Sequence, residues 1–499
     1  MSPAVAGLND RLALAALLVP LAGAALIGAL AERRRGPREL TAVATTLFTA
    51  AIALYLTKPV ASGGDVSFIA WQVGPSLHLS FAVDRLGLLF AVVAATLWLA
   101  ATIYSRGYLV QSPDQRRYYA FWVVSLGVTL GVAWAANLFT LYVFYELLTF
   151  TTYPLVIQAG GAAAARAGRN YIAYSLSGAA LVLVAITGVL MLGGDLGFMP
   201  GGPLAAGVGG GPGLSLVAGC LLAGFGVKAA LVPLHGWLPG AMVAPTPVSA
   251  LLHAVAVVKS GVFGILRVLF FVIGAGPAAR AGFDLPLIWL AGASILLAAL
   301  AALRQDVLKR RLAYSTISHL AYISLGAATL NGAGIAGALL HLVMHAVLKV
   351  TLFFCAGIFI TQTGRTRISE LDGIGRVLPW TMGAFTVASL GLIGIAPVGG
   401  FVSKWYLIGG GLAGGGPGVV TVLFLSSLLN AAYLLPIVTR AYFRRPDPAA
   451  LRGRRARSTG PEAPWSMLGP ALALAGLAII LGLWPGLPLA LIGALVGEL

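Results

Sequence analysis

Long apolar runs recur from one end of this 499-residue chain to the other, and they restrict its fold more than any other feature. Each run is long enough to cross the hydrocarbon core of a bilayer, which takes about 20 residues in an α-helix. Backbone groups in hydrocarbon must be satisfied within a helix or a closed barrel. The runs lack the short alternating pattern of barrel strands. The sequence therefore predicts an all-α polytopic membrane protein.

The composition supports this prediction. Only 9% of the residues are charged and 59% are hydrophobic, whereas a soluble domain carries about 25% charged residues. The net charge of +17 could suggest a nucleic-acid partner. The lysines and arginines instead cluster in alternate loops, as expected where basic loops are retained in the cytoplasm. We therefore expect a lipid bilayer around the chain and no nucleic acid.

The apolar runs predict fourteen spans, with ends uncertain by about three residues. They cover residues 11–31, 39–57, 84–105, 117–135, 137–158, 170–194, 213–235, 246–273, 284–303, 311–330, 333–362, 379–410, 416–440 and 466–492. The loops on one side hold 23 lysines and arginines and those on the other hold four. This asymmetry predicts a multi-pass protein of the cell inner (plasma) membrane with both termini extracytoplasmic.

Two of the predicted spans are broken by proline. One reads GFGVKAALVPLHGWLP, in which Pro233 follows Lys228, and the other reads LGLIGIAPVGGFVSKWYL, in which Pro397 precedes Lys404. Proline removes a backbone donor and interrupts a helix. At membrane depth, such a break is tolerated only beside protein or a water-lined cavity. One broken span in each half of a chain is typical of transporters built from repeats.

These breaks predict how the chain is organised. Residues 1–116 would form three N-terminal helices with an extracytoplasmic hairpin in segment 58–83. Residues 117–275 and 284–440 would form two five-helix repeats, each with its break on the fourth member. An odd number of spans per repeat makes the second repeat inverted relative to the first. Residues 441–499 would form a cytoplasmic linker and a last helix.

Ionisable side chains inside the spans are the candidate functional residues. Four lysines and one mid-span glutamate lie there: Lys228, Lys259, Lys349, Lys404 and Glu146. An ionisable group at mid-bilayer costs about 2.5–3.5 kcal/mol, so each needs a cavity, a partner or a function. Burial lowers the pKa of a lysine and a nearby carboxylate raises it. A movable partner could thus switch proton loading on a buried lysine.

Histidines follow the same pattern. His341, His345 and Lys349 are spaced to share one helix face, and histidine titrates near physiological pH. A lone membrane histidine also occurs as a simple helix-packing residue, and His235 could cap its interrupted helix. No carboxylate or cysteine joins the histidines at metal-ligand spacing. No phosphate-binding loop and no cysteine set for an iron–sulfur cluster is present, so we expect no metal and no cofactor.

Six segments resemble the antiporter-like subunits of respiratory complex I (subunits L, M and N) and the D-type subunit of Mrp cation/proton antiporters. They are FYELLTFTTYPL, VKAALVPLHGWLPGAMVAPTPVSALLHA, VVKSGVFGILR, LKRRLAYSTISHLAYISLG, HLVMHAVLKVTLFF and APVGGFVSKW, within residues 80–440. The resemblance implies a fourteen-helix fold with two inverted five-helix repeats. The histidine–lysine stripe, and lysine rather than glutamate at position 404, are more similar to the Mrp D-type protein than to subunit M. Because the last predicted span ends at residue 492, we expect the chain to lack the long lateral helix of subunit L.

The resemblance also implies roles for individual residues. Glu146 would tune Lys228, Lys259 would bridge to a central axis, and Lys404 would be the terminal site near which protons leave. The main path would comprise Glu146, Lys228, Lys259, His319, His345, Lys349 and Lys404. A secondary path would comprise His235, His253 and His341, and the helix breaks lie at Pro233 and Pro397.

The predicted function is a proton- or cation/proton-translocating subunit of a multisubunit membrane complex, most similar to the Mrp D-type protein. It would not be an enzyme on its own. The alternatives are a proton-pumping subunit of a redox complex or of an inorganic-carbon uptake complex, and an autonomous transporter. The coupling ion could be H⁺ alone or Na⁺ with H⁺. Only Glu146 offers the carboxylate oxygen that sodium prefers.

Overall fold

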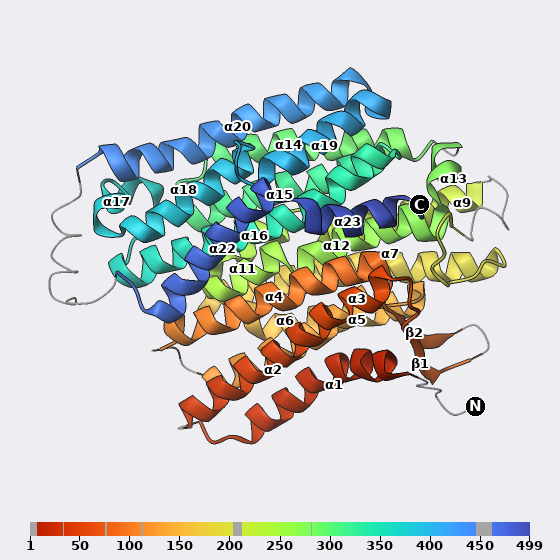
Figure 1. Ribbon diagram of the computed structural model, residues 1–499, viewed down its shortest axis with the longest axis horizontal. Helices are drawn as coiled ribbons and strands as arrows, with labels where there is room; N and C mark the ends of the chain where they lie inside the picture. Colours follow the sequence, from red (N-terminus) through yellow and green to blue (C-terminus); the bar gives the residue numbers. More distant parts are fainter. Residues whose placement is uncertain are drawn as a thin grey trace.

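The computed structural model describes residues 7–32, 34–74, 77–110, 112, 114–202, 212–280, 282–445 and 462–499. Its long helices run side by side, with α1 and α2 at one edge and α20 at the other (Figure 1). Within these residues, nine helical segments are long and apolar enough to cross a membrane, and three shorter apolar helices accompany them. The fold is thus the predicted all-α bundle, while the number fourteen stays a prediction.

The N-terminal part holds three long helices and a small sheet. Its elements are α1 (Leu8–Ala29), α2 (Arg35–Tyr55), α3 (Thr57–Ala61), β1 (Ser67–Gln72), β2 (His78–Ala82) and α4 (Arg85–Tyr108). Strands β1 and β2 pair antiparallel, with Ser67 opposite Ala82. This hairpin lies in the segment where the alternating pattern predicts one. The start of α1, the hairpin and the end of the last helix lie at the same end of the bundle (Figure 1).

Six further long helices belong to the bundle. They are α5 (Gln115–Ala133), α6 (Leu138–Val156), α7 (Gly161–Met191), α14 (Asp284–Leu303), α15 (Leu308–Ala328) and α20 (Gly416–Phe443). The chain also forms the short elements α13 (Ala275–Arg280), η3 (Ile368–Glu370), α17 (Ile374–Val377) and η4 (Gly411–Gly415). Residues 203–211 lie outside the described residues, as do residues 446–461 of the predicted linker.

Helix α16 (Gly332–Thr363) is the central element. Its most apolar window is 94% buried, and it contacts α15, α18, α19 and α11. The side chain of Asn331 caps it by accepting a hydrogen bond from the Gly334 N–H at 2.9 Å. A Cβ at Gly337 would lie 2.6 Å from the backbone nitrogen of Leu407. Glycine therefore lets the broken helix α19 approach the residues that α16 carries.

Both predicted helix breaks are present. Helix α9 (Pro212–Lys228) ends at Lys228, and α10 (Trp237–Gly240) follows beyond Pro233. Helix α18 (Pro379–Ile393) ends before Pro397, and α19 (Gly400–Gly410) begins after it. The predicted spans 213–235 and 379–410 are therefore not continuous helices.

Two other predicted spans each consist of more than one helical element. Span 246–273, which follows the short turn η1 (Ala241–Val243), divides into α11 (Thr246–Ala254), α12 (Val257–Arg267) and the π-helical turn η2 (Val268–Ile273). Span 466–492 divides into α22 (Trp465–Leu483) and α23 (Gly486–Val496). Pro485 explains the second break. The first falls at Val255 and Ala256, which carry no local breaking signal.

A buried ion pair joins two distant helices at the end of the bundle that holds the hairpin. Asp84 caps α4 by accepting a hydrogen bond from the Gly87 N–H at 2.8 Å. Its carboxylate also accepts hydrogen bonds from the guanidinium of Arg267, one of them at 2.8 Å. The Arg267 side chain is only 1% exposed. Arg267 is therefore held inside the bundle by Asp84.

We predict that Arg267→Met lowers the free energy of unfolding by about 2–3 kcal/mol. Breaking a fully buried pair costs about 3–5 kcal/mol, and the Asp84 side chain is 35% exposed. Thermal unfolding in detergent would measure the loss. Arg85→Met is the control, because its partner Glu498 is 42% exposed and such a pair contributes about 0–1 kcal/mol. Equal losses in the two variants would contradict this assignment.

Candidate functional site

Lys228 lies at the first helix break. It is the last residue of α9 and is fully buried. Its ammonium donates a hydrogen bond to the backbone carbonyl of Tyr145 on α6. The Nζ atom also lies 3.4 Å from the centroid of the Tyr145 ring, a cation–π contact. Helix α9 thus ends at a lysine whose side chain is hydrogen-bonded to the neighbouring helix α6.

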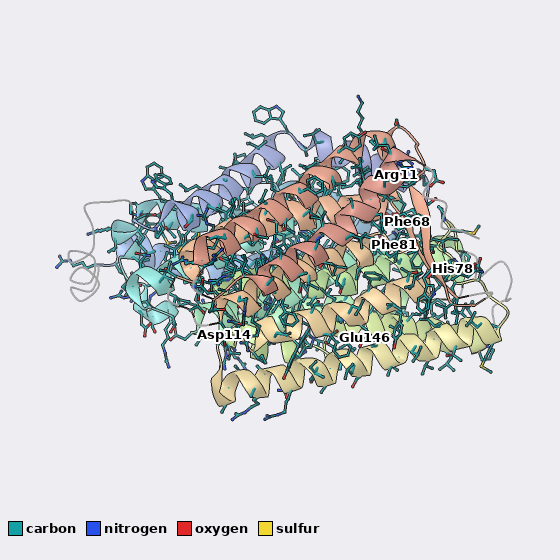
Figure 2. The ribbon with its side chains drawn as sticks, turned by 90° about the horizontal axis from the view of Figure 1, so that it is seen from below. Arg11, Phe68, His78, Phe81, Asp114 and Glu146 are labelled. Atoms are coloured by element: carbon teal, nitrogen blue, oxygen red, sulfur yellow. The ribbon has the colours of Figure 1, made fainter. Side chains whose placement is uncertain are left out.

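Glu146 follows Tyr145 on α6 but does not pair with Lys228. No ion pair joins the two side chains among the described residues, although their charges interact through space. Glu146 is half-buried, and its Oε1 atom is buried without a hydrogen bond. Figure 2 shows it near α7, with which α6 is in contact. Tyr145, rather than Glu146, supplies the contact to Lys228.

Two more lysines form hydrogen bonds between the central helix α16 and its neighbours. Lys259 of α12 donates to the backbone carbonyl of Leu342 on α16, at 2.6 Å. Lys349 of α16 donates to the carbonyl of Leu312 on α15, at 3.1 Å. Both lysines are buried, at 1% and 0% exposure. Their ammonium groups therefore bridge three adjacent helices.

Aromatic rings stack between α15 and α16. His319 Nδ1 lies 3.0 Å from His341 Nε2, and His341 Nδ1 lies 2.9 Å from the Ser403 hydroxyl. The ring centroids of His319 and His345 are 5.5 Å apart, and those of His319 and Tyr322 are 5.2 Å apart. Both nitrogens of His345 are buried without a hydrogen bond. The structure thus brings all three predicted histidines of this region together.

Lys404 lies at the second break, on α19. Its ammonium donates to the carbonyl of Ile393 at 2.9 Å and to the hydroxyl of Ser427 at 3.0 Å. Ile393 is the last residue of α18, so this carbonyl is one of those that the break leaves without a helical partner. The Tyr322 ring centroid lies 5.3 Å from Nζ. Tyr322 therefore lies between the histidine stack and the terminal lysine.

His253 and His235 make fewer polar contacts. His253, on α11, is fully buried and neither of its ring nitrogens forms a hydrogen bond. Its ring centroid lies 5.2 Å from that of Phe353 on α16. His235, in the turn after α9, is half-buried near the ring of Tyr314. The structure places neither side chain in hydrogen-bond contact with the histidine stack.

These residues can together carry protons but are not joined by continuous hydrogen bonds. All four lysines donate to backbone carbonyls rather than to the histidines. Histidine with intervening water can pass protons between such groups. No group of three histidine, cysteine or acidic residues in the described part of the chain is placed to hold a metal ion.

Sequence reasoning missed four residues of this site. Tyr145, Tyr322, Ser403 and Asn430 contact the predicted residues or the helix breaks. Ser403 directly precedes Lys404, so the sequence offered one signal. The tyrosines and the asparagine lie in ordinary apolar runs, and only the packing of the helices shows their position.

Comparison with known proteins establishes the family. A sequence model described as "NADH:quinone oxidoreductase/Mrp antiporter, TM" matches residues 135–430. The chain belongs to this family. A second model, "NADH-Ubiquinone oxidoreductase (complex I), chain 5 N-terminus", matches residues 71–119. The predicted resemblance to complex I and Mrp proteins is confirmed, and this family member is a multi-pass membrane protein.

Individual relatives come from both branches of the family. The chain is 37% identical to NADH-quinone oxidoreductase subunit N of Desulforudis audaxviator, over 82% of this chain and 83% of that protein. It is 32% identical to a probable K(+)/H(+) antiporter A/B subunit of Rhizobium meliloti, over 78% of this chain and 38% of that protein.

Solved structures show the same fold. A chain of the Mrp complex from Dietzia sp. DQ12-45-1b aligns with a TM-score of 0.86 at 23% identity, covering 99% of this chain and 98% of that one. A chain of respiratory complex I from Thermus thermophilus aligns with a TM-score of 0.82 at 24% identity, covering 97% of this chain and 99% of that one.

We predict that Gly394→Ala destabilises the second break and displaces Lys404. Gly394 has φ +96°, and a Cβ there would lie 2.7 Å from Cδ of Lys404. A left-handed backbone costs a residue with a Cβ about 1–2 kcal/mol. Gly383→Ala on the same helix is the control, because no atom lies within 4 Å of its Cβ position and alanine favours helix by about 1 kcal/mol. The thermal unfolding temperature should fall for the first variant and not for the second. Equal unfolding temperatures for the two variants would contradict the role given to Gly394.

Proposed function

We propose that this chain is a proton- or cation/proton-translocating subunit of a multisubunit membrane complex. The observation that carries the proposal is the row of buried lysines and histidines that crosses the bundle from the first helix break to the second. Ionisable groups inside a membrane are rare and mark ion or proton pathways. A buried lysine exchanges its proton readily when its surroundings change. The chain would not be an enzyme on its own.

The proposed path follows the site from one break to the other. Glu146 and Lys228 gate the first half, where Tyr145 contacts Lys228. Lys259 leads to the central helix α16, where the stacked histidines and Lys349 lie. The path ends at Lys404. His253 and His235 serve as side branches, since they are protonatable but lie apart from the stack.

The proposed architecture is a pair of inverted five-helix repeats, each holding one break. Residues 117–275 would form the first and residues 284–440 the second. We also propose that the loops rich in arginine face the cytoplasm of a cell with an inner membrane, and that both termini lie outside. The common end of the bundle reached by the start of α1 and the end of α23 supports that arrangement (Figure 1).

Two kinds of assembly fit this protein. The 32% identity to a probable K(+)/H(+) antiporter protein supports a cation/proton antiporter similar to Mrp. The 37% identity to NADH-quinone oxidoreductase subunit N supports a proton-pumping module of a redox complex. Each places the chain among other membrane subunits. The proton path within the chain is the same in both.

We predict that Lys228→Met or Lys259→Met, in the assembled complex, lowers proton translocation by about 100-fold or more. Loss of a positioned proton carrier typically costs about 10²–10⁴ in rate. Fluorescence of a pH-sensitive dye in vesicles would measure transport. Lys58→Met is the control, because Lys58 lies in the short helix α3 beside the hairpin and should leave transport unchanged. Near-normal transport in both test variants, with intact assembly, would refute the path.

We predict that purification in mild detergent distinguishes the two assemblies. An antiporter should bring down only small membrane subunits, whereas a redox-driven or carbon-hydrating complex should bring down soluble subunits that carry iron–sulfur clusters or zinc. The chain alone in proteoliposomes should show no cation-dependent proton flux. Flux from the chain alone would instead identify an autonomous transporter.

A further inference from the structure

A column of hydroxyl and amide groups runs along α20 and faces α15. On α20, the buried face carries Ser426, Asn430 and Tyr433. On α15, Ser315 is fully buried and opposes them. Polar side chains in membrane helices commonly form hydrogen bonds between helices, and here they follow one another in a row. The proposed path from Glu146 to Lys404 does not use it.

The column begins at the end of the bundle that holds α17 (Figure 1) and the arginine-rich loops. There Arg311 donates to the backbone carbonyl of Tyr433 at 2.9 Å. Also at this end, Arg440 of α20 pairs with Asp372, at 2.7 Å. Charged side chains therefore lie at this end of the column.

Hydrogen bonds connect the groups inside the column. The hydroxyls of Ser315 and Tyr433 are 2.7 Å apart. The Tyr433 hydroxyl donates to Oδ1 of Asn430 at 2.6 Å, so Ser315 is the donor to Tyr433. Hydrogen-bond donation therefore runs from Ser315 to Tyr433 to Asn430, away from the charged end of the column. Two successive hydroxyl groups can shift protons along such a chain.

The column ends at the second helix break. The Asn430 amide donates to the carbonyl of Leu392 at 3.3 Å, and Lys404 donates to the next carbonyl, that of Ile393. Asn430 and Lys404 thus donate hydrogen bonds to two successive backbone carbonyls at the C-terminal end of α18. Ser427, on the same turn of α20 as Asn430, accepts a hydrogen bond from Lys404. The column therefore reaches the immediate surroundings of the terminal lysine.

We propose that Ser315, Tyr433 and Asn430 form a proton inlet that loads Lys404 from the arginine-rich end of the bundle. A proton from water at that end passes to Ser315, which gives its own hydroxyl proton to Tyr433. Tyr433 releases its own hydroxyl proton beside Asn430, and a water molecule there carries a proton to the neutral amine of Lys404. Each hydroxyl thus accepts one proton for each proton that it releases. Lys404 becomes an ammonium.

The inlet changes the direction assigned to the second half of the chain. The sequence suggests that protons leave the path near Lys404. The hydrogen-bonded column instead starts next to Arg311, at the end where the basic loops lie, which the charge asymmetry assigns to the cytoplasm. The inference rests on the proposed function, because it supplies an entrance to the same path.

A cysteine at the inner end of the column tests the opening without measuring transport. Ser427→Cys in the whole complex would be exposed in oriented vesicles to Ag⁺ from one face at a time. Protection of the introduced thiol from later alkylation would be read by mass spectrometry. We expect protection about tenfold faster from the arginine-rich face. The native Cys355, fully buried on α16, is the internal control and should stay unreacted.

Faster protection from the opposite face would overturn the proposal. So would an unreactive introduced thiol in vesicles where a surface cysteine at the arginine-rich end reacts. Protection of Cys355 at the same rate as the introduced thiol would also overturn it, since Ag⁺ would then be entering without a defined route.

A second variant removes the hydroxyl alone. Tyr433→Phe should lower proton translocation by about tenfold or more, the low end of the effect of a lost proton carrier. Tyr442→Phe on the same helix, outside the column, should leave the rate within about twofold. If Lys404→Met transports normally, the proposed function itself fails. If Lys404→Met is inactive and Tyr433→Phe is normal, only the inlet fails.

Discussion

An ammonium group inside an apolar bundle needs acceptors, and in this protein the backbone supplies them. Each buried lysine donates to a carbonyl of a neighbouring helix or of a broken helix end: Tyr145, Leu342, Leu312 and Ile393. A carbonyl oxygen has two lone pairs, so it can accept this bond in addition to its helical one. Because a carbonyl is neutral, it binds the ammonium without fixing a counter-charge. The proton therefore remains removable, and the helices remain connected.

The need for carbonyl acceptors accounts for the close approach of the helices that surround α16. The central helix α16 provides one acceptor, contributes one lysine and carries two histidines of the stack. Its neighbours must approach closely enough for side chains on one helix to reach carbonyls on another. Gly337 permits that approach on the α19 side. Close packing and the lysine–carbonyl hydrogen bonds thus depend on the same contacts.

The sequence predicted which ionisable groups are buried, because a lysine or histidine within a long apolar run has no other place. It also predicted the two breaks that contain Pro233 and Pro397. It could not predict the partners of the lysines, since backbone carbonyls leave no mark in the sequence. The pair of Asp84 and Arg267 joins residues 183 positions apart, and only the fold brings them together. Glu146 shows the reverse case, because the sequence suggests that it pairs with Lys228, whereas the Lys228 ammonium donates to the backbone carbonyl of Tyr145.

The interruption between α11 and α12 has a geometric consequence for the side chains on either side of it. In one continuous α-helix, residues six positions apart point about 120° away from each other, since each residue turns the helix by about 100°. His253 and Lys259 nevertheless both contact α16, beside Phe353 and at Leu342. Those contact points are eleven residues apart, or about 16 Å along the axis. Because the helix is interrupted, α11 and α12 are rotated relative to each other. Side chains from both helices can therefore contact α16, at two different positions along its axis.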